Sequence, residues 1–204
     1  MSTSNPGHWD TAFSQDITSR GWYQAAADTS WALLADVPPT ASLIDVGAGA
    51  SVLVDEALDR GFTDLTVLDW SPVALQVARD RLGSQGAAVH WVVADVTNWQ
   101  PTRTYDVWHD RAVLHFLLSE PQWRGYHRTL LAATHPGSLA VIGVFAPTGP
   151  PMCAGLPVQR YSVTDLATFL GPQFHVESTD RTPHTRPDGD LQDYTWVRAR
   201  RTQA

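Results

Sequence analysis

The stretch Ile44-Asp45-Val46-Gly47-Ala48-Gly49 decides the fold, because an apolar β-type run passes here directly into a glycine-containing turn. Residues 42–47 predict a strand, and residues 51–60 predict the helix that follows the turn. Glycine allows the backbone to turn tightly and lets a ligand approach without meeting a Cβ atom. Ligands of open α/β sheets bind in the crevice beyond the carboxyl ends of the strands. A Gly-x-Gly pair is also common in ordinary turns, so the surrounding residues have to decide its meaning.

Strand-like and helix-like segments alternate after this turn. Further strands are expected at residues 65–69, 89–94, 105–109 and 139–145, with helical patterns between them. Such alternation is typical of βαβ units and a parallel sheet. Two late strands, 174–181 and 194–200, have no helix between them and therefore predict an antiparallel hairpin. The expected fold class is α/β: a Rossmann-like seven-stranded sheet of five parallel-type βα units, closed by the antiparallel C-terminal hairpin.

Two further helices are expected beside the crevice. Residues 112–118 predict a helix directly after the fourth strand. Before the sheet, an N-terminal helix is predicted from apolar residues at roughly helical spacing, which are Trp22, Ala26, Trp31 and Leu34. The run Val37-Pro38-Pro39 ends that helix, because proline cannot continue it.

Composition restricts the function classes. The formal net charge is −7, and all 14 basic residues are arginine. An acidic chain repels a phosphate backbone, so nucleic acid is not expected as a partner. Without lysine there is no Schiff-base or lysine-base mechanism. The single cysteine, Cys153, excludes an intrachain disulfide and a cysteine-based zinc site.

Other patterns argue against a membrane partner and a metal site. The apolar runs are shorter than the roughly 18–20 residues that span a bilayer, and residues 1–9 are too polar for a secretory signal. A cytoplasmic protein is therefore expected. The histidines His115, His127 and His135 share one segment, but their spacing matches no common zinc pattern, so no metal is expected.

Three acidic residues, Asp45, Asp69 and Asp95, lie at the carboxyl ends of the first three predicted strands. Asp69 comes 20 residues after Gly49, where a carboxylate can accept hydrogen bonds from both hydroxyls of a ribose. Asp95 is placed to meet an adenine amine. Each of the three could instead be a helix cap or a turn former.

The glycine loop differs from that of a dinucleotide site. The third glycine of such a loop would fall at position 52, which is Val52, and Asp45 lies immediately before the turn. A diphosphate disfavours a carboxylate there, whereas a cationic cofactor tolerates it.

With these residues in place, the chain resembles the class I S-adenosylmethionine (SAM)-dependent methyltransferase superfamily over about residues 40–200. The first motif of that superfamily is matched by residues 44–49, although Ala48 replaces a frequent cysteine and Ala50 a frequent threonine. Asp69 and Asp95 match its strand-two and strand-three acids. The resemblance implies an N-terminal helical lid at residues 1–40 and one SAM-binding domain at residues 41–204.

The resemblance also implies roles for individual residues. The glycines of the first motif back the methionine part of SAM, Asp69 holds the ribose, Asp95 and Val96 flank the adenine, and Trp70 lies against the adenine face. An aromatic residue of the lid such as Trp22 shields the sulfonium from water and attracts it by a cation–π contact. The expected cofactor-binding residues are Asp45, Gly47, Ala48, Gly49, Asp69, Trp70, Asp95, Val96 and Trp22.

Two local similarities point to different methyl acceptors. His8-Trp9-Asp10-x-x-Phe13 is similar to the start of some small protein-lysine methyltransferases. Asp110-Arg111-Ala112 resembles the corresponding stretch of thiopurine and thiol methyltransferases. The sequence therefore leaves the acceptor open.

The end of the fourth strand, His109-Asp110-Arg111, is the expected catalytic segment. His109 is a candidate base or a backbone contact to the SAM amine. Asp110 could orient His109, bind a cationic acceptor, or cap the following helix. Arg111 could bind the SAM carboxylate or an anionic acceptor, or pair with Asp110.

The expected function is methyl transfer from SAM to a small acceptor, such as a thiol, an amine or a carboxylate. The second candidate is protein-lysine methylation. Outside this class, a non-catalytic nucleotide-binding module and an NAD(P)-dependent reductase stay open, although a Tyr-x-x-x-Lys pair cannot occur without lysine. The sequence does not specify the oligomeric state.

Overall fold

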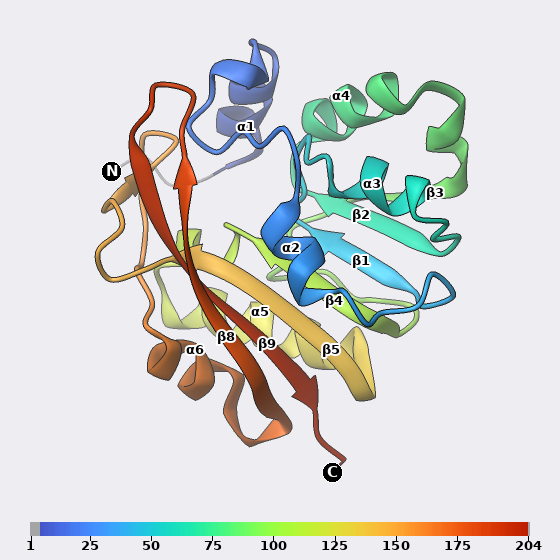
Figure 1. Ribbon diagram of the computed structural model, residues 1–204, viewed down its shortest axis with the longest axis vertical. Coiled ribbons are helices and arrows are strands. Elements are labelled where there is room, and N and C mark those ends of the chain that lie inside the picture. Colours follow the sequence, from blue (N-terminus) through green and yellow to red (C-terminus); the bar gives the residue numbers. More distant parts are fainter. Residues whose placement is uncertain (1–4, 204) are drawn as a thin grey trace.

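A computed structural model describes residues 5–203 and contains one large twisted sheet (Figure 1). Its seven strands follow the order β3-β2-β1-β4-β5-β9-β8. The parallel strands are β1 (Leu43–Val46), β2 (Leu65–Asp69), β3 (Val89–Val93), β4 (Tyr105–Arg111) and β5 (Thr134–Phe145). The antiparallel hairpin comprises β8 (Phe174–Thr185) and β9 (Leu191–Arg201), and β9 pairs with β5. The predicted fold class is confirmed.

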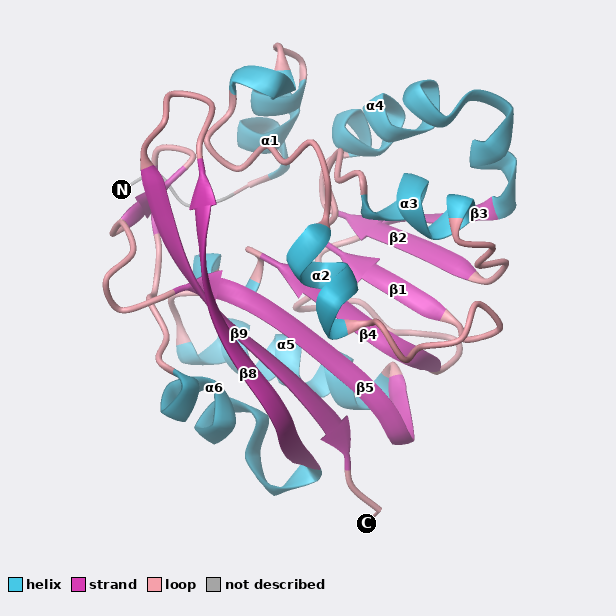
Figure 2. Ribbon diagram, in the orientation of Figure 1, coloured by secondary structure: helices cyan, strands magenta, loops and turns pink. Residues whose placement is uncertain are grey.

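Helices cover both faces of the sheet (Figure 2). Alternate side chains of each strand point to opposite faces, so Leu43 and Ile44 enter two different hydrophobic clusters. The first cluster includes residues of α2 (Asp28–Leu33), α3 (Leu53–Asp59) and α4 (Pro72–Leu82). The second includes residues of α5 (Glu120–Ala132) and α6 (Val163–Leu170). The molecule is a three-layer sandwich in which the parallel strands are buried on both sides.

Local sequence signals fix several element ends. The Ser71 side chain accepts a hydrogen bond from the Ala74 amide at the start of α4, and Pro72 occupies the first turn. The same helix ends at Gly83, whose φ of +55° is a conformation that side chains with a Cβ rarely adopt. In the loop after β5, the short strands β6 (Met152–Cys153) and β7 (Leu156–Pro157) form a separate small sheet.

The prediction of a continuous helix containing Trp22 and Leu34 is wrong. The structure has α1 (Pro6–Phe13), a short 3-10 turn (Ile17–Ser19) and then α2, which starts at Asp28. Trp22 lies in the intervening loop, where its ring contacts Trp9 with centroids 6.2 Å apart. Tertiary contacts with other aromatic rings therefore override the approximate helical spacing.

The prediction of a helix at residues 112–118 is also wrong. Strand β4 continues to Arg111, which pairs with Gly143 of β5, and only Leu114–Phe116 forms a 3-10 turn. The Asp110 carboxylate accepts hydrogen bonds from the amides of Val113 and Leu114, at 2.8 and 3.1 Å. These bonds close a tight turn instead of starting an α-helix.

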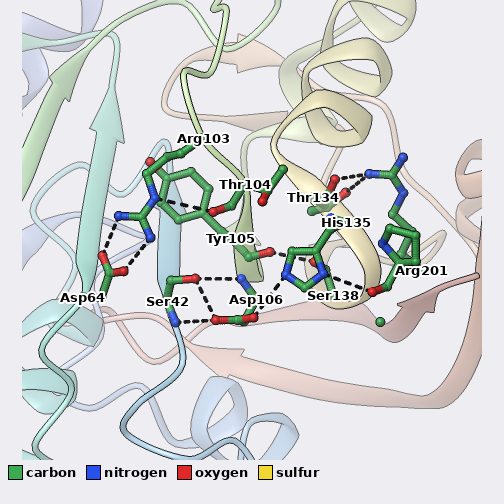
Figure 3. Close-up of polar contacts among 12 residues, drawn as sticks. Ser42, Asp64, Arg103, Thr104, Tyr105, Asp106, Thr134, His135, Ser138 and Arg201 are labelled. Carbon is green, nitrogen blue, oxygen red and sulfur yellow. Dashed lines mark hydrogen bonds and ion pairs between the residues drawn. The ribbon is translucent and has the colours of Figure 1, made fainter.

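Polar contacts join the amino ends of β1, β4 and β5 (Figure 3). Asp106 accepts hydrogen bonds of 2.8 Å from both the amide and the hydroxyl of Ser42, and its other oxygen lies 3.1 Å from Nε2 of His135. The Ser138 hydroxyl donates to the carbonyl of Tyr105 at 2.7 Å. These groups pair with one another, which is typical of a structural network. Within residues 5–203, every helix is too short or too polar to cross a bilayer.

Candidate active site

A cleft opens at the carboxyl ends of β1, β2 and β4, between the glycine loop and the N-terminal segment. All nine residues that the sequence predicted to contact a cofactor line this cleft: Asp45, Gly47, Ala48, Gly49, Asp69, Trp70, Asp95, Val96 and Trp22. Of the three predicted catalytic residues, Arg111 lines the cleft, whereas His109 and Asp110 do not. These placements bring the predicted cofactor residues together, and their roles stay predictions.

The two glycines of the loop are required by their surroundings. Gly47 and Gly49 each have a φ of +57°. A Cβ on Gly47 would lie 1.9 Å from Cγ2 of Val113, and a Cβ on Gly49 would lie 2.5 Å from Cζ of Phe13. The loop therefore allows the turn after β4 and helix α1 to approach the backbone without side-chain interference.

Asp69 is a buried acceptor at the end of β2. Its carboxylate oxygens accept hydrogen bonds from the amides of Gly49 and Ser71, both at 2.7 Å. Burial raises the pKa of Asp69 to about 6, although the backbone hydrogen bonds oppose the shift. The carboxylate thus ties the glycine loop to the start of α4 and also faces the cleft.

Asp95 closes a turn after β3. One carboxylate oxygen accepts from the amide and the hydroxyl of Thr97, at 2.8 and 2.7 Å. This is the turn-forming role that the sequence left open for a strand-end aspartate. Asp95 nevertheless lines the cleft, together with the neighbouring Val96.

Asp45 belongs to a buried polar chain that crosses from the sheet to α2. Its Oδ1 lies 2.7 Å from Nδ1 of His109, and Nε2 of His109 lies 2.9 Å from the hydroxyl of Ser30. All three residues are buried. The second oxygen of Asp45 is buried without a hydrogen-bond partner among residues 5–203. An unpaired buried carboxylate oxygen that lines a cleft favours a cationic ligand.

Asp110 holds the turn after β4. Besides the two amides of that turn, it accepts a hydrogen bond of 2.6 Å from the hydroxyl of Tyr126, which itself accepts from the Trp108 indole. Asp110 is fully buried, and this burial raises its pKa to about 6. Its contacts hold the turn after β4, and the helix that Asp110 could have capped is not formed.

Arg111 has an incompletely paired guanidinium. Its Nη1 donates to the carbonyl of Trp22 at 3.0 Å, and its Cζ lies 5.0 Å from the centre of the Tyr194 ring. Nε and Nη2 are buried without a hydrogen-bond partner in the described part of the chain. Arg111 is therefore able to bind an anion with two parallel hydrogen bonds.

Aromatic side chains form one wall of the cleft. Trp9 contacts Phe116 with ring centroids 5.0 Å apart, and Phe13 contacts Trp22 at 6.0 Å. The sequence placed Trp9 and Trp22 in the lid but missed Phe116 and its neighbour Val113, because it assigned both to a helix. No local signal identifies these two residues, since their position depends on the turn that Asp110 closes.

Cys153, another residue that lines the cleft, is buried. Burial raises the pKa of its thiol to about 12, so the thiol is protonated at neutral pH and is a weak nucleophile. Across residues 5–203, no group of three or more His, Cys, Asp or Glu side chains could hold a metal ion.

Comparisons of the sequence with known proteins point to one reaction class. A family model described as a methyltransferase domain matches residues 43–137. The chain is 26% identical over 106 residues to EEF1A lysine methyltransferase 2 of Mus musculus, a match that covers 45% of this chain. It spans only 42% of the length of that relative.

Comparisons of the structure support the fold over nearly the whole chain. The 1,6-didemethyltoxoflavin-N1-methyltransferase of Burkholderia thailandensis, solved with S-adenosylhomocysteine, superposes with a TM-score of 0.71 and 22% identity. That match covers 100% of this chain and 93% of the other. The N-methyltransferase NodS of Bradyrhizobium japonicum WM9 gives a TM-score of 0.73 at 16% identity, covering 97% and 98% of the two chains. At these identities the likeness demonstrates a shared fold.

The family match and the fold agree with the features of the cleft, which combines a strand-end glycine loop with three carboxylates. They support the predicted resemblance to SAM-dependent methyltransferases, and the NodS structure itself was solved with S-adenosylhomocysteine. Residues 43–137 thus match a methyltransferase domain, and the fold of the chain is that of known SAM-dependent methyltransferases.

Proposed function

We propose that this chain transfers the methyl group of SAM to a small acceptor bound in the same cleft. The observation that carries the proposal is the convergence of the glycine loop with Asp45, Asp69 and Asp95 on one cleft behind an aromatic wall. SAM carries a sulfonium and an ammonium group, so an acidic and partly enclosed cleft suits it.

The residues of the cleft fit the parts of SAM. Gly47 and Gly49 line the cleft at the place where the resemblance puts the methionine part of SAM, and Val113 and Phe13 pack into the space that their missing Cβ atoms leave. The unpaired oxygen of Asp45 is available to the ammonium group. Asp69 retains acceptor capacity for the ribose hydroxyls, since a carboxylate has about four acceptor sites. The resemblance implies that Asp95 and Val96 flank the adenine, and both residues line the cleft.

His109 acts in this proposal as a positioning residue. A carboxylate can accept hydrogen bonds but cannot donate them. Nδ1 of His109 therefore donates a hydrogen bond to Asp45 and holds that carboxylate in one orientation. Ser30 fixes the other side of the imidazole ring. The role of His109 as a base stays a prediction, and its absence from the cleft lining favours the positioning role.

Catalysis then depends on positioning and exclusion of water. SAM, when bound, supplies an electrophilic methyl carbon, to which the acceptor's lone pair bonds as the carbon–sulfur bond breaks. The rings of Trp9, Trp22 and Phe116 exclude water from the cleft and present faces that attract a cation. Such an in-line transfer needs alignment more than strong acid–base help.

Protein-lysine methylation is the second candidate, because the curated relative is a lysine methyltransferase. The deciding experiment incubates the protein with SAM labelled on the methyl group and separate pools of thiols, amines, carboxylates and proteins. We expect label in a small-molecule pool. Label confined to the protein pool would favour the second candidate. Tighter calorimetric binding of NAD(P)H than of SAM would contradict both.

A further inference from the structure

A second cavity adjoins the cleft beneath the β8–β9 hairpin. Residues of that hairpin, among them His184, Tyr194 and Trp196, line it together with residues at the start of α2. Gln24 and Arg111 line both this cavity and the cleft, so Arg111 stands between the two. The second cavity is thus placed to hold a molecule that reaches into the cofactor cleft.

The free edge of Arg111 has the geometry of a carboxylate-binding group. Nη1 is used by the Trp22 carbonyl, whereas Nε and Nη2 have no partner within residues 5–203. These two nitrogens form one side of the planar guanidinium, and their N–H bonds match the two oxygens of a carboxylate. Two unpaired donors that are shielded from water weaken the fold unless an anion binds them.

Tyr194 supplies a further donor in the same cavity. Its ring packs against the guanidinium of Arg111, and its hydroxyl is buried without a partner in the described chain. Burial raises the pKa of this hydroxyl to about 12, so it stays protonated and can donate. Arg111 and Tyr194 therefore both line this cavity, and each carries a buried donor without a partner in the described chain.

Among the residues that line the second cavity, Arg111 is the one whose positive charge can bind an anion. Burial lowers the pKa of His184 to about 4, so its ring is neutral at pH 7 and bonds to the Gly21 carbonyl at 3.0 Å. Asp28, the acidic residue among those lining this cavity, is exposed at the start of α2.

We propose that Arg111 and Tyr194 bind a carboxylate carried by the methyl acceptor, which enters from the second cavity. This inference rests on the proposed function of the cleft. Tyr194 lines the second cavity but not the cleft, so the anion that both residues share lies on the acceptor side. The methionine carboxylate of SAM has the same chemistry and is the alternative source that the experiment separates.

The test measures binding of small carboxylates by calorimetry with the protein saturated with S-adenosylhomocysteine. The probes are acetate, benzoate, phenylacetate and indole-3-acetate, each paired with its neutral amide. We expect at least one carboxylate to bind tenfold or more tightly than its amide. Arg111→Gln should abolish that preference, Arg111→Lys should reduce it, and Tyr194→Phe should weaken carboxylate binding several-fold.

Circular dichroism and thermal melts serve as the folding control for these variants, and S-adenosylhomocysteine affinity is measured separately because Arg111 also lines the cleft. Arg181→Gln, which removes a charge from the same hairpin outside the cavity lining, should keep the carboxylate preference. Equal binding of every carboxylate and its amide would overturn the inference. A tenfold loss of S-adenosylhomocysteine affinity in folded Arg111→Lys would also overturn it, because the carboxylate would then be the cofactor's own. Failure of the unchanged protein to bind S-adenosylhomocysteine would instead overturn the proposed function itself.

Discussion

At the scale of single residues, Asp69 combines a structural and a binding role. It bonds to the amides of Gly49 and Ser71 and faces the cleft at the same time. Its pKa, raised to about 6 by burial, lies above the ordinary value of 3.8. Between these two pH values the folded protein holds a proton that the unfolded chain has lost. The contribution of Asp69 to stability therefore falls as the pH rises through this window and is constant above it.

The raised pKa of Asp69 predicts pH-dependent cofactor binding. The ionised carboxylate is the better acceptor for ribose hydroxyls, so SAM affinity should fall as the pH drops below about 6. Asp69→Asn should flatten the pH dependence of SAM affinity between pH 5 and pH 7. Asp69→Ala should lower SAM affinity at least about tenfold. Each charge-assisted hydrogen bond that it removes contributes about 1.5–3 kcal/mol before water replaces the side chain. Calorimetry across this pH range checks the prediction. Unchanged affinity in folded Asp69→Ala would show a purely structural role.

His109 offers a second test at this scale. His109→Ala removes the donor that orients Asp45 and should weaken SAM binding about tenfold, equivalent to about 1.4 kcal/mol. His109→Asn keeps a donor near the position of Nδ1 and should lose less than about threefold. A base would behave differently: turnover would fall roughly 10²–10⁴-fold with SAM affinity unchanged. Parallel measurements of SAM affinity and turnover distinguish the two roles.

At the scale of elements, the glycine loop is the joint between β1 and α3. Gly47 and Gly49 share a φ of +57°, and each is approached by a side chain from another segment. The loop therefore couples the turn after β4 and helix α1 to the same few backbone atoms. A side chain on Gly47 would disturb the turn after β4, and one on Gly49 would disturb helix α1.

Alanine substitutions separate backbone strain from this crowding. Gly61→Ala is the matched control, because Gly61 has a φ of +84° but open space around a Cβ. It should cost about 1–2 kcal/mol of stability through strain. Gly47→Ala adds the clash with Val113 and should cost about 1–3 kcal/mol more, and it should abolish detectable SAM binding. Denaturant unfolding and calorimetry give the two quantities. Equal losses of stability in both variants would contradict the packing argument.

At the scale of the whole molecule, the N-terminal segment before β1 packs against two different parts of the protein. Trp31, Leu33 and Leu34 belong to the hydrophobic cluster on one face of the sheet. Trp9 and Phe13, by contrast, line the cleft. The predicted division at residue 40 stays a prediction, and residues 1–4 of that segment lie outside the described residues. The part of the segment before α2 therefore lines the cleft, whereas α2 and the residue after it pack on the sheet.

Two truncations test that division. Deletion of residues 1–16 removes α1 and its aromatic residues but leaves α2, so the protein should stay folded and bind SAM at least several-fold more weakly. Deletion of residues 1–34 also removes Ser30 and the buried Trp31 and Leu34. Loss of one large buried side chain costs about 3–5 kcal/mol, so this deletion should prevent cooperative folding. Circular dichroism with thermal melts checks both outcomes. A stably folded second truncation would place the domain boundary near residue 40, as the sequence predicted.

The sequence by itself determined the seven-stranded sheet, its hairpin and nine of the residues that line the cleft. Strand-end position is readable because an apolar run that passes into a glycine turn is a local feature. All nine predicted cofactor residues consequently lie at one edge of the sheet. Two predicted helices were wrong. The helical spacing around Trp22 was only approximate. At the end of β4, the Asp110 carboxylate closes a turn where a helix was expected.

Only the tertiary structure decided which partners the strand-four residues meet. His109 bonds to Asp45 and Ser30, which are 64 and 79 positions away in the chain. Arg111 stacks on Tyr194 of the C-terminal hairpin and keeps two donors unpaired. Sequence periodicity records which face of a strand a side chain occupies. It cannot record what packs against that face, because packing partners are chosen by the closure of distant segments over the sheet.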